Sequence, residues 1–554
     1  MKVSEKIRSC ELIGKGSFGS VFRVEMQDGT IKAVKKLVIP SDVDFAGSLR
    51  ELDLNRKLSH PNILMVEQIC ETDKSETKNT KIECFSGYRC DILCLEFTVA
   101  IGNLHELVEK HSSGKYLSLL YIKKIFTQIL LGLWYMHRNG YIHRDIKPPN
   151  ILYFENEVIK ICDFGLGKRY LKYDRHTKEI ASPFFKAPEI LLGESYDTSS
   201  DIWNAGCVFH YLLSRGDYIV DGVDDLDIDL RYPEKVTKEE EFTAIMNAMP
   251  YKINREMIKS QSPMANKFNY KAPRTLTEEN FFQSYSYVKI PTEAEVISLS
   301  VMLFRNILRV DPKERKSARV LLRTNFLILS PEIKEIVEYE IERYAKNTKE
   351  EVQDNIALPI ISTQTRTYMT EIATDLFVNH RKTNWYSDRR LFSAMELFDR
   401  TTTGAGKIAP LLLPNSTLDK TKFYFNSCLY IAIKFHSAPS EDIGFRYKDT
   451  PFGSGGLTNL KNAGLIENKI LCAIDYNIYS RTILDEFLEV GVPEMLDLVS
   501  LFLFNKTGLG YDLDGNVLNP RESYKKWKSN GSKYEELTKK SELWKIAKNE
   551  KWIR

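Results

Sequence analysis

The stretch Tyr141–Gly165 reads YIHRDIKPPNILYFENEVIKICDFG and carries three polar residues at a distinctive spacing. Asp145 closes His-Arg-Asp, Asn150 follows five residues later, and Asp163 opens Asp-Phe-Gly thirteen residues after Asn150. Transfer of a terminal phosphoryl group needs in-line placement of the reactants and cations that spread the charge, with little covalent help from the protein. Two carboxylates and an amide supply hard oxygen ligands for Mg²⁺ and an acceptor for an attacking hydroxyl. The spacing therefore indicates a phosphoryl-transfer site.

Each polar residue of this stretch has an expected role. Asp163 would chelate a Mg²⁺ ion that bridges the phosphates, and Asn150 would hold a second ion. Asp145 would accept the hydrogen bond of the attacking hydroxyl, and Lys147 would neutralise the γ-phosphate. A single aspartate is more often a helix cap or a turn residue. The prediction therefore depends on the joint pattern, together with features upstream of it.

The first of these upstream features is a glycine-rich segment, IGKGSFGSVF, which contains Gly14-x-Gly16-x-x-Gly19-x-Val21. Glycines let the backbone lie against phosphates because they carry no Cβ atom. The same spacing serves dinucleotide-binding folds, in which a helix follows. Here a second strand, ending in KAVKK, follows instead. The segment is therefore interpreted as a cover for nucleotide phosphates.

The second upstream feature is Lys35, which lies on that second strand. A lysine there is suited to pair with phosphate oxygens as a point charge, although a lone strand lysine is usually solvated. Glu51, on the following helix, is expected to hold Lys35 by an ion pair. The alternative is a surface glutamate within a helical charge pattern.

The composition is that of an ordinary globular protein. Of the 554 residues, 43% are hydrophobic and 28% are charged, and the net charge of +3 gives no reason to expect nucleic-acid binding. The basic end of the chain, residues 522–554, is expected to be a solvated helix and tail. Nine cysteines occur without a CxxC pair or a Cys/His metal spacing, which indicates reduced thiols.

The same composition bears on location. No apolar run reaches the ~18 residues of a membrane span, and the first residues lack the apolar core of a signal peptide. We therefore expect a cytoplasmic or nuclear protein without a membrane partner. Lys, Asn, Ile and Tyr are frequent, which fits an AT-rich source such as a large DNA virus acting in a host cell.

Hydrophobic periodicity predicts two parts in the first 330 residues. Residues 8–37 are expected to form short strands, because VFRVEM and TIKAVKKLVI alternate apolar and polar residues around the turn QDGT. Residues 46–59 have helical leucine spacing and end at His-Pro-Asn. From residue 117 onward helical patterns dominate, beginning with a helix that ends at Gly140. An α+β architecture follows, with a small β-rich lobe before a larger helical lobe.

The remaining chain is predicted to be helical. Residues 331–365 indicate a helix followed by a linker, and residues 366–490 show further helical patterns. Within them, DRRLFSAMELFDRT is amphipathic, and KFYFNSCLYIAIKF is apolar nearly all round. The latter is therefore expected to be a buried central helix. No catalytic constellation occurs in this part.

Residues 8–330 resemble the eukaryotic protein kinases in further motifs. KAPEI, which contains Glu189, closes an activation segment that Asp163-Phe164-Gly165 opens. SSDIWNAG looks like the family's buried Asp-x-Trp-x-x-Gly, in which Asp201 would stabilise the catalytic loop. VDPKERKSARVLL resembles the last helix pair and places Arg315 opposite Glu189 as an ion pair. IKPPN after Asp145 is the serine/threonine form.

The resemblance implies the bilobal protein kinase fold, with ATP and Mg²⁺ as cofactors and protein serine or threonine hydroxyls as acceptors. LCLEFT looks like the hinge that binds adenine through backbone groups. The residues expected around ATP are Ile13, Gly14, Lys15, Gly16, Ser17, Phe18, Gly19, Ser20, Val21, Ala33, Lys35, Glu96, Thr98 and Leu152.

The resemblance narrows to the cyclin-dependent kinase group. SLRELDLNRKLSHPNIL is similar to the PSTAIRE helix of that group, with Arg50 beside Glu51. Thr177 falls where the group carries its activating phosphothreonine, and a plain loop residue is the alternative. The expected phosphate clamp comprises Arg50, Arg144, Lys168 and Arg169. Lys168 stands where the family has arginine, which weakens the fork geometry.

Two departures from the group concern regulation and substrates. Phe18 stands where the group has tyrosine, so inhibitory phosphorylation at that position is excluded. Lys186 stands where the group has arginine, and Pro183 is unusual in the substrate-binding segment. A preference for Ser/Thr-Pro sites is therefore left open.

Residues 366–490 resemble a cyclin box. Asp399-Arg400 matches a family motif after an apolar helix, and YIAIKF matches the family's buried helix, ending near Lys434. IENKILCAIDYNIYSRTILDEFL carries Glu467. In cyclins the corresponding lysine and glutamate contact the regulatory helix of the kinase, so Lys434 and Glu467 are the expected contacts. Residues 401–418 would be an insertion, and residues 491–554 a helical basic extension or a degenerate second box. A generic helical accessory domain is the alternative.

The resemblances together predict a monomeric serine/threonine kinase fused in one chain to its own cyclin-like activator. The helical domain would dock on the helix at residues 46–59 and turn Glu51 toward Lys35. One alternative is a kinase whose helical domain only recruits protein substrates. A second is a scaffold whose nucleotide site senses ATP without transferring phosphate.

Overall fold

The computed structural model describes residues 7–16, 19–38, 45–72, 92–112, 117–169, 182–220, 235–251, 253, 257–258, 260, 262–267, 293–328, 330–346, 363–379, 386–402, 418–436, 470 and 484. The chain divides into two compact units. The first comprises Met1–Leu37, Leu54–Tyr170 and Arg175–Lys349. The second comprises Val38–Asp53, Leu171–Asp174 and Glu350–Arg554.

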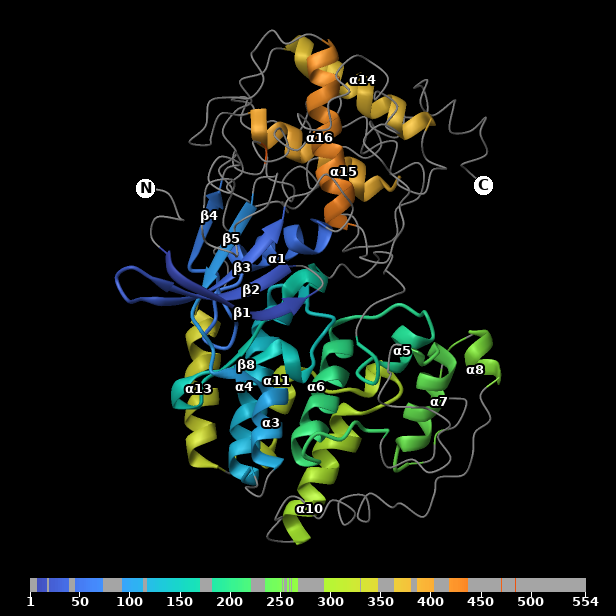
Figure 1. The fold of residues 1–554 in the computed structure, drawn as a ribbon. Coiled ribbons are helices and arrows are strands. Elements are labelled where there is room, and N and C mark those ends of the chain that lie inside the picture. The colour runs from blue at the N-terminus through green and yellow to red at the C-terminus, as the bar shows by residue number, and fades with distance from the viewer. Residues whose placement is uncertain are drawn as a thin grey trace. The chain divides into compact units, whose positions relative to one another are not determined.

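A five-stranded sheet with the order β1-β2-β3-β5-β4 forms the N-terminal part of the first unit (Figure 1). Its strands are β1 (Ile7–Gly16), β2 (Gly19–Met26), β3 (Ile31–Val38), β4 (Gln68–Thr72) and β5 (Ile92–Phe97). Strands β2 and β3 are antiparallel around the predicted turn, where the N–H of Met26 donates to Thr30 O at 2.8 Å. Gly29 in this turn has φ of +84°, which glycine adopts without a Cβ penalty. The predicted hairpin is confirmed.

The helical part of the first unit is built around α4 and α6, which lie side by side in Figure 1. Between them the rings of Phe126 and Phe209 stack at 4.3 Å between centroids. Ser118 caps α4 by accepting from the N–H of Tyr121. The helices are α3 (Leu104–Ser112), α4 (Leu119–Arg138), α5 (Pro188–Leu191), α6 (Thr198–Leu213), α7 (Lys238–Ala248), α8 (Pro263–Lys267), α10 (Glu293–Ser300), α11 (Ala318–Leu321), α12 (Asn325–Ile328) and α13 (Pro331–Lys346), with a π-helix, η6 (Val301–Ile307), and a 3-10 turn, η7 (Pro312–Glu314).

The stretch Tyr141–Gly165 runs through short strands and turns beside α4. Strands β6 (Gly102–Asn103), β8 (Ile151–Tyr153) and β9 (Ile159–Ile161) form one sheet, and β7 (Tyr141–Ile142) pairs with β10 (Lys168–Arg169). Three 3-10 turns lie between or after these strands: η2 (Pro148–Asn150), η3 (Glu155–Glu157) and η4 (Phe164–Leu166). A Cβ on Gly132 of α4 would lie 2.9 Å from both Asn62 O and Ile161 Cδ1. The helix can therefore approach β9 closely only because a glycine stands there.

Helix α13 belongs to the first unit, although the sequence predicted that its domain ends near residue 330. Its apolar face joins the core that contains α4, through Ile333, Val337 and Ile341. Its Tyr344 hydroxyl donates to Ser59 O at 3.3 Å. The helix expected at the start of residues 331–365 is thus present, and it packs as part of the first unit.

Apart from Val38, Tyr386 and Ser387, the described part of the second unit is α-helical, as predicted. It holds most of α1 (Phe45–Lys57), up to Asp53, together with α14 (Thr363–Asn379), α15 (Asp388–Thr402) and α16 (Leu418–His436). Helix α16 packs against both α14 and α15, and the residues from Tyr424 to Ile433 are buried. The prediction of a buried central helix is therefore confirmed. The cyclin-like fold remains a prediction.

Candidate active site

The turn that carries Asp145 is hydrogen-bonded to a buried aspartate of α6. Asp201 accepts hydrogen bonds from the N–H groups of His143 (2.9 Å) and Arg144 (2.8 Å). Its Oδ2 also lies 2.8 Å from His137 Nε2. Burial alone would raise the pKa of Asp201, but the hydrogen bonds from His137 and His143 lower it below its ordinary value. The carboxylate is therefore kept ionised while it fixes the backbone before Asp145.

Two residues of the site have unusual backbone conformations. Arg144 has φ of +72° and Asp163 has φ of +65°, a left-handed region that residues other than glycine rarely adopt. Such conformations persist where the surrounding contacts over-determine them, and they cluster at functional sites. Here Asp201 holds the N–H of Arg144, and the buried rings of Phe164 and His143 pack edge-on at 5.3 Å.

Asp145 lies in a dense network of polar contacts. Its Oδ1 accepts from the N–H (3.2 Å) and the hydroxyl (3.0 Å) of Ser182. Its Oδ2 accepts from Asn150 Nδ2 at 2.9 Å and lies 2.8 Å from Lys147 Nζ. Lys147 also donates to the Ser182 hydroxyl at 2.6 Å. The structure thus brings together the predicted residues Asp145, Lys147 and Asn150, and adds Ser182.

Ser182 was not predicted from the sequence. It lies before Pro183, the residue that the sequence singled out as unusual, and seven residues before Glu189. A hydroxyl residue inside the segment bounded by Asp-Phe-Gly and Ala-Pro-Glu was the available signal. A lone serine in a loop has many roles, however, so the signal was too weak to use.

Lys35 and Asp163 also lie close together. Lys35 Nζ is 3.6 Å from Asp163 Oδ1, and the lysine is 9% exposed. Oδ1 of Asp163 is buried and accepts no hydrogen bond from the described residues. Nδ2 of Asn150 donates to Asp145, which leaves the amide oxygen as the atom that can face a cation. A carboxylate oxygen and an amide oxygen are hard ligands, so the two side chains fit Mg²⁺.

The residues expected around the nucleotide come from β1, β2, β3, β5 and β8. Gly14 and Gly16 lie on β1 and pair with Val21 and Gly19 of β2, and Ser20 pairs with Lys15. Ala33 is buried, Leu152 is half-buried and Ile13 is exposed. In the segment predicted to be the hinge, Glu96 O accepts from the N–H of Glu67, and the Thr98 hydroxyl donates to the Glu67 carboxylate at 2.5 Å. Ser17 and Phe18 lie outside the described residues.

Three residues of the predicted phosphate clamp, Arg144, Lys168 and Arg169, lie in the first unit. Arg144 is buried, and its guanidinium donates to Leu166 O (2.5 Å) and to the Tyr196 hydroxyl (2.9 Å). Lys168 pairs with Ile142, and Arg169 lies beside it on β10. Arg50 and Glu51 are buried and belong to the second unit. Thr177 lies outside the described residues, so the clamp remains a prediction.

Arg50 contacts the C-terminal helical part of its own unit. Its Nη1 donates to Phe435 O at 3.0 Å. Phe435 follows Lys434 directly near the end of α16, where the last carbonyls of a helix lack intrahelical partners. The side chain of Lys434 and all of Glu467 lie outside the description.

The predicted ion pair between Glu189 and Arg315 is confirmed. Arg315 Nη1 and Nη2 donate to Glu189 Oε1 and Oε2 at 2.6 and 2.7 Å. Both side chains are buried, and this two-pronged geometry is the strong form of an arginine–carboxylate contact. It fixes α5, and with it the end of the segment that carries Ser182.

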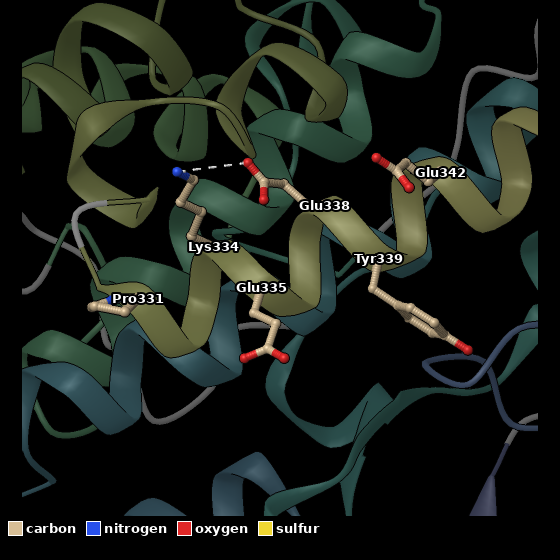
Figure 2. A pocket seen from close by; sticks show the side chains of 6 residues that line it. All are labelled: Pro331, Lys334, Glu335, Glu338, Tyr339 and Glu342. Carbon is tan, nitrogen blue, oxygen red and sulfur yellow. Dashed lines mark ion pairs between the residues drawn. The ribbon is translucent and has the colours of Figure 1, made fainter.

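Figure 2 shows a surface pocket on α13 that contains none of the predicted site residues. Lys334 and Glu338 pair across one of its edges at 3.8 Å, and Tyr339 is 63% exposed. Its lining residues are Pro331, Lys334, Glu335, Glu338, Tyr339 and Glu342.

No helix in the described part of the chain combines the length and apolarity needed to cross a membrane.

Comparison with known proteins gives one family. The family model described as "Protein kinase domain" matches residues 7–327, more than half of the chain. The chain is 28% identical over 312 residues to Cell division control protein 2 homolog 1 of Trypanosoma brucei brucei, covering 55% of this chain and 92% of that protein. It is 34% identical over 227 residues to mouse (Mus musculus) Cyclin-dependent kinase-like 4, covering 40% and 60%. It is 32% identical over 212 residues to Cyclin-dependent kinase 9-A of Xenopus laevis, covering 37% and 54%.

Proposed function

Because the chain belongs to the protein kinase family and is a serine/threonine protein kinase, we propose that the network around Asp145 transfers the γ-phosphoryl group of ATP to protein hydroxyls. The single observation that supports this assignment is the set of contacts that joins Asp145 to Asn150, Lys147 and Ser182. These contacts orient one carboxylate on a turn whose backbone is hydrogen-bonded to buried Asp201. Positioning of this kind is the main contribution a protein makes to phosphoryl transfer.

In the proposed mechanism the acceptor hydroxyl donates its hydrogen bond to Asp145. The hydroxyl oxygen forms a bond to the γ-phosphorus while the bond between that phosphorus and the bridging oxygen breaks, so ADP leaves. Asp145 holds the proton that the hydroxyl loses. Lys147, 2.8 Å from Asp145, stabilises negative charge on the transferred group.

Nucleotide binding is proposed for the residues predicted from the sequence. The strands β1 and β2 would cover the phosphates from Gly14 to Val21, and Lys35 would pair with phosphate oxygens. Asn150 and Asp163 would hold Mg²⁺, which supplies positive charge to the phosphates. The backbone of Glu96 and Thr98 would contact the adenine.

The test is phosphate transfer from ATP to a histone mixture by the full chain. Asp145→Asn keeps the shape of the side chain and removes its charge, so transfer should fall at least ~100-fold. Asp28→Asn, the same change in the exposed β2–β3 turn, is the matched control and should leave transfer unchanged. Equal transfer by the Asp145→Asn variant and the wild type would refute the assignment.

We also propose that the C-terminal helical unit activates the kinase within the same chain. The support is the hydrogen bond from Arg50 to Phe435 O, because Arg50 adjoins Glu51 on α1. A cation at the C-terminal end of α16 is favoured by the partial negative charge there. The second unit would hold α1 so that Glu51 faces Lys35. Linking activator and kinase gives an effective concentration of roughly millimolar.

Charge reversal at Lys434 tests this activation. Lys434→Glu should lower kcat more than the KM for ATP, because it would disturb α1 and not the nucleotide residues. A variant with normal kcat but a raised KM for protein substrates would favour the alternative, in which the helical unit recruits substrates. A chain that binds ATP but transfers no phosphate would support the nucleotide-sensing scaffold instead.

Phosphorylation of Thr177, with Arg50, Arg144, Lys168 and Arg169 binding the phosphate, is a further proposal about activation of the kinase.

A further inference from the structure

The segment Ser182–Lys186 is anchored to carboxylates at both of its ends. At its start, Ser182 donates two hydrogen bonds to Asp145 (3.2 and 3.0 Å). Further along, the N–H of Phe184 donates to Oε1 of Glu241 on α7 at 2.6 Å. Lys186 Nζ donates to Oε2 of the same carboxylate at 2.9 Å. One end is thus tied to the proposed catalytic base and the other to a helix that carries no predicted site residue.

Glu241 differs from the other acidic residues of α7. It is 1% exposed, whereas Glu239 and Glu240 are exposed. Glu240 forms a capping box with Thr237 and so serves the helix itself. A buried carboxylate is strongly destabilising without a partner, and Lys186 supplies the opposite charge. Glu241 therefore binds the segment and is not needed for capping α7.

The backbone that Glu241 holds is strained. Phe184 has φ of +63°, a conformation that an aromatic residue rarely adopts. The ring of Phe184 is buried, with its centroid 5.5 Å from that of Tyr218. Asn204 of α6 donates to Phe185 O. These contacts over-determine the strained backbone, and Glu241 accepts the N–H of the strained residue itself.

We propose that Glu241 is a positioning residue that holds the segment Ser182–Lys186 in the shape in which Ser182 engages Asp145 and a protein substrate is bound. Lys186 supplies the positive charge that stabilises the buried carboxylate of Glu241. The inference rests on the proposed role of Asp145, and it assigns to α7 a part in placing the acceptor. It follows that Glu241 and Lys186 act as one unit.

The test measures phosphate transfer from ATP to a histone mixture by the full chain and its variants. Glu241→Gln retains an acceptor for Phe184 but loses the charge that pairs with Lys186. Its kcat/KM for histone should fall ~10-fold, while its KM for ATP stays within about twofold of the wild type. Lys186→Arg keeps the cation and should stay within about threefold of the wild type. Glu239→Gln, an exposed glutamate on the same helix, is the matched control and should behave as wild type.

The double variant provides the decisive comparison. Lys186→Met leaves Glu241 buried and unpaired, so it should lose more kcat/KM than Glu241→Gln does. Adding Glu241→Gln to Lys186→Met should recover activity about 10-fold relative to Lys186→Met alone. A double variant no better than Lys186→Met, or a Glu241→Gln variant with wild-type kcat/KM, overturns the inference. An inactive wild-type chain would refute the proposed function itself, which keeps the two failures distinct.

Discussion

At the scale of single residues, Asp145 is oriented by side chains that come from two separate segments. Asn150 and Lys147 follow it on the same turn, whereas Ser182 lies 37 residues further along the chain, before Pro183. Ser182 therefore links the position of the segment Ser182–Lys186 to the orientation of the Asp145 carboxylate. A carboxylate with such partners has few orientations available, which is the condition for efficient in-line transfer.

Substitution of Ser182 tests this coupling. Ser182→Ala removes the hydroxyl that joins Asp145 and Lys147, so kcat should fall ~10- to 100-fold through misplacement of the carboxylate. Ser182→Thr keeps the hydroxyl and should retain most of the activity. Steady-state kinetics with saturating ATP measure the effect. Equal kcat values for the alanine and threonine variants would show that the hydroxyl has no part in transfer.

Asp201 carries a second prediction, because it holds the backbone before Asp145. Asp201→Asn replaces an acceptor by an amide that cannot accept from His143, Arg144 and His137 together. The variant should lose about 2–4 kcal/mol of unfolding free energy along with its activity. Asp197→Asn, at the N-cap of the same helix, should be nearly neutral because asparagine caps as well as aspartate. Denaturant unfolding of the two variants makes the comparison, and equal stability would contradict it.

The residues that lie together in the candidate site could be predicted where a motif joins several of them. His-Arg-Asp, the asparagine after it and Asp-Phe-Gly led to Asp145, Asn150 and Asp163, and Asp-x-Trp-x-x-Gly led to Asp201. Ser182 and Glu241 could not be found in this way, because each is a single common residue whose partners lie 35 or more positions away. Their contacts depend on how the segment Ser182–Lys186 folds.

At the scale of elements, α13 holds the loop that follows α1. The ring of buried His60 packs against Tyr135 of α4 and Tyr344 of α13, with centroids 5.0 and 5.1 Å away. His60 Nδ1 accepts from the N–H of Asn62, and Nε2 is 3.8 Å from Glu340 Oε2. Helix α13 lies beyond the residues that match the kinase family model, and it stabilises the loop that follows the end of α1.

This environment makes part of the stability pH-dependent. Burial, with Arg343 and Lys160 nearby, lowers the pKa of His60 to about 3 from an ordinary 6.5. The folded chain therefore keeps His60 neutral where the unfolded chain takes up a proton. Stability falls as pH drops below 6.5, by about 2 kcal/mol from this residue at pH 5.

His60→Asn should remove that contribution to the pH slope, because asparagine does not titrate and can still accept from the N–H of Asn62. The loss of unfolding free energy between pH 7 and pH 5 should be about 2 kcal/mol smaller than in the wild type. His105→Asn, at an exposed site on α3, is the control, and its loss of unfolding free energy between pH 7 and pH 5 should match that of the wild type. An unchanged slope in the His60 variant would show that His60 titrates normally in the folded chain.

Element type could be predicted where the sequence has a clear period or turn. The turn QDGT led to the β2–β3 hairpin, and the apolar stretch around Tyr424–Ile433 led to the buried helix α16. Two features could not be predicted. The π-helix Val301–Ile307 has no distinct sequence pattern, and α13 is a charged amphipathic helix whose partner is set by tertiary packing.

At the scale of the whole molecule, α1 is shared by the two units. Residues up to Asp53 belong with the C-terminal helices, and the helix continues from Leu54 in the first unit. The proposal that the C-terminal unit sets Glu51 rests on a contact within the second unit, the hydrogen bond from Arg50 to Phe435 O. Residue spacing does not predict that the helical domain docks on the helix at residues 46–59. That expectation came from the resemblance of residues 366–490 to a cyclin box.

Comparison of the full chain with a chain that ends at Lys346 tests the central claim most directly. This end point keeps α13 and removes α14, α15 and α16. Both proteins are assayed for phosphate transfer from ATP to a histone mixture, with Asp145→Asn to exclude a contaminating kinase and circular dichroism to verify folding. We predict Asp145-dependent transfer by the full chain and a loss of at least ~100-fold in kcat on truncation. Equal kcat for the two folded proteins would contradict activation by the C-terminal unit.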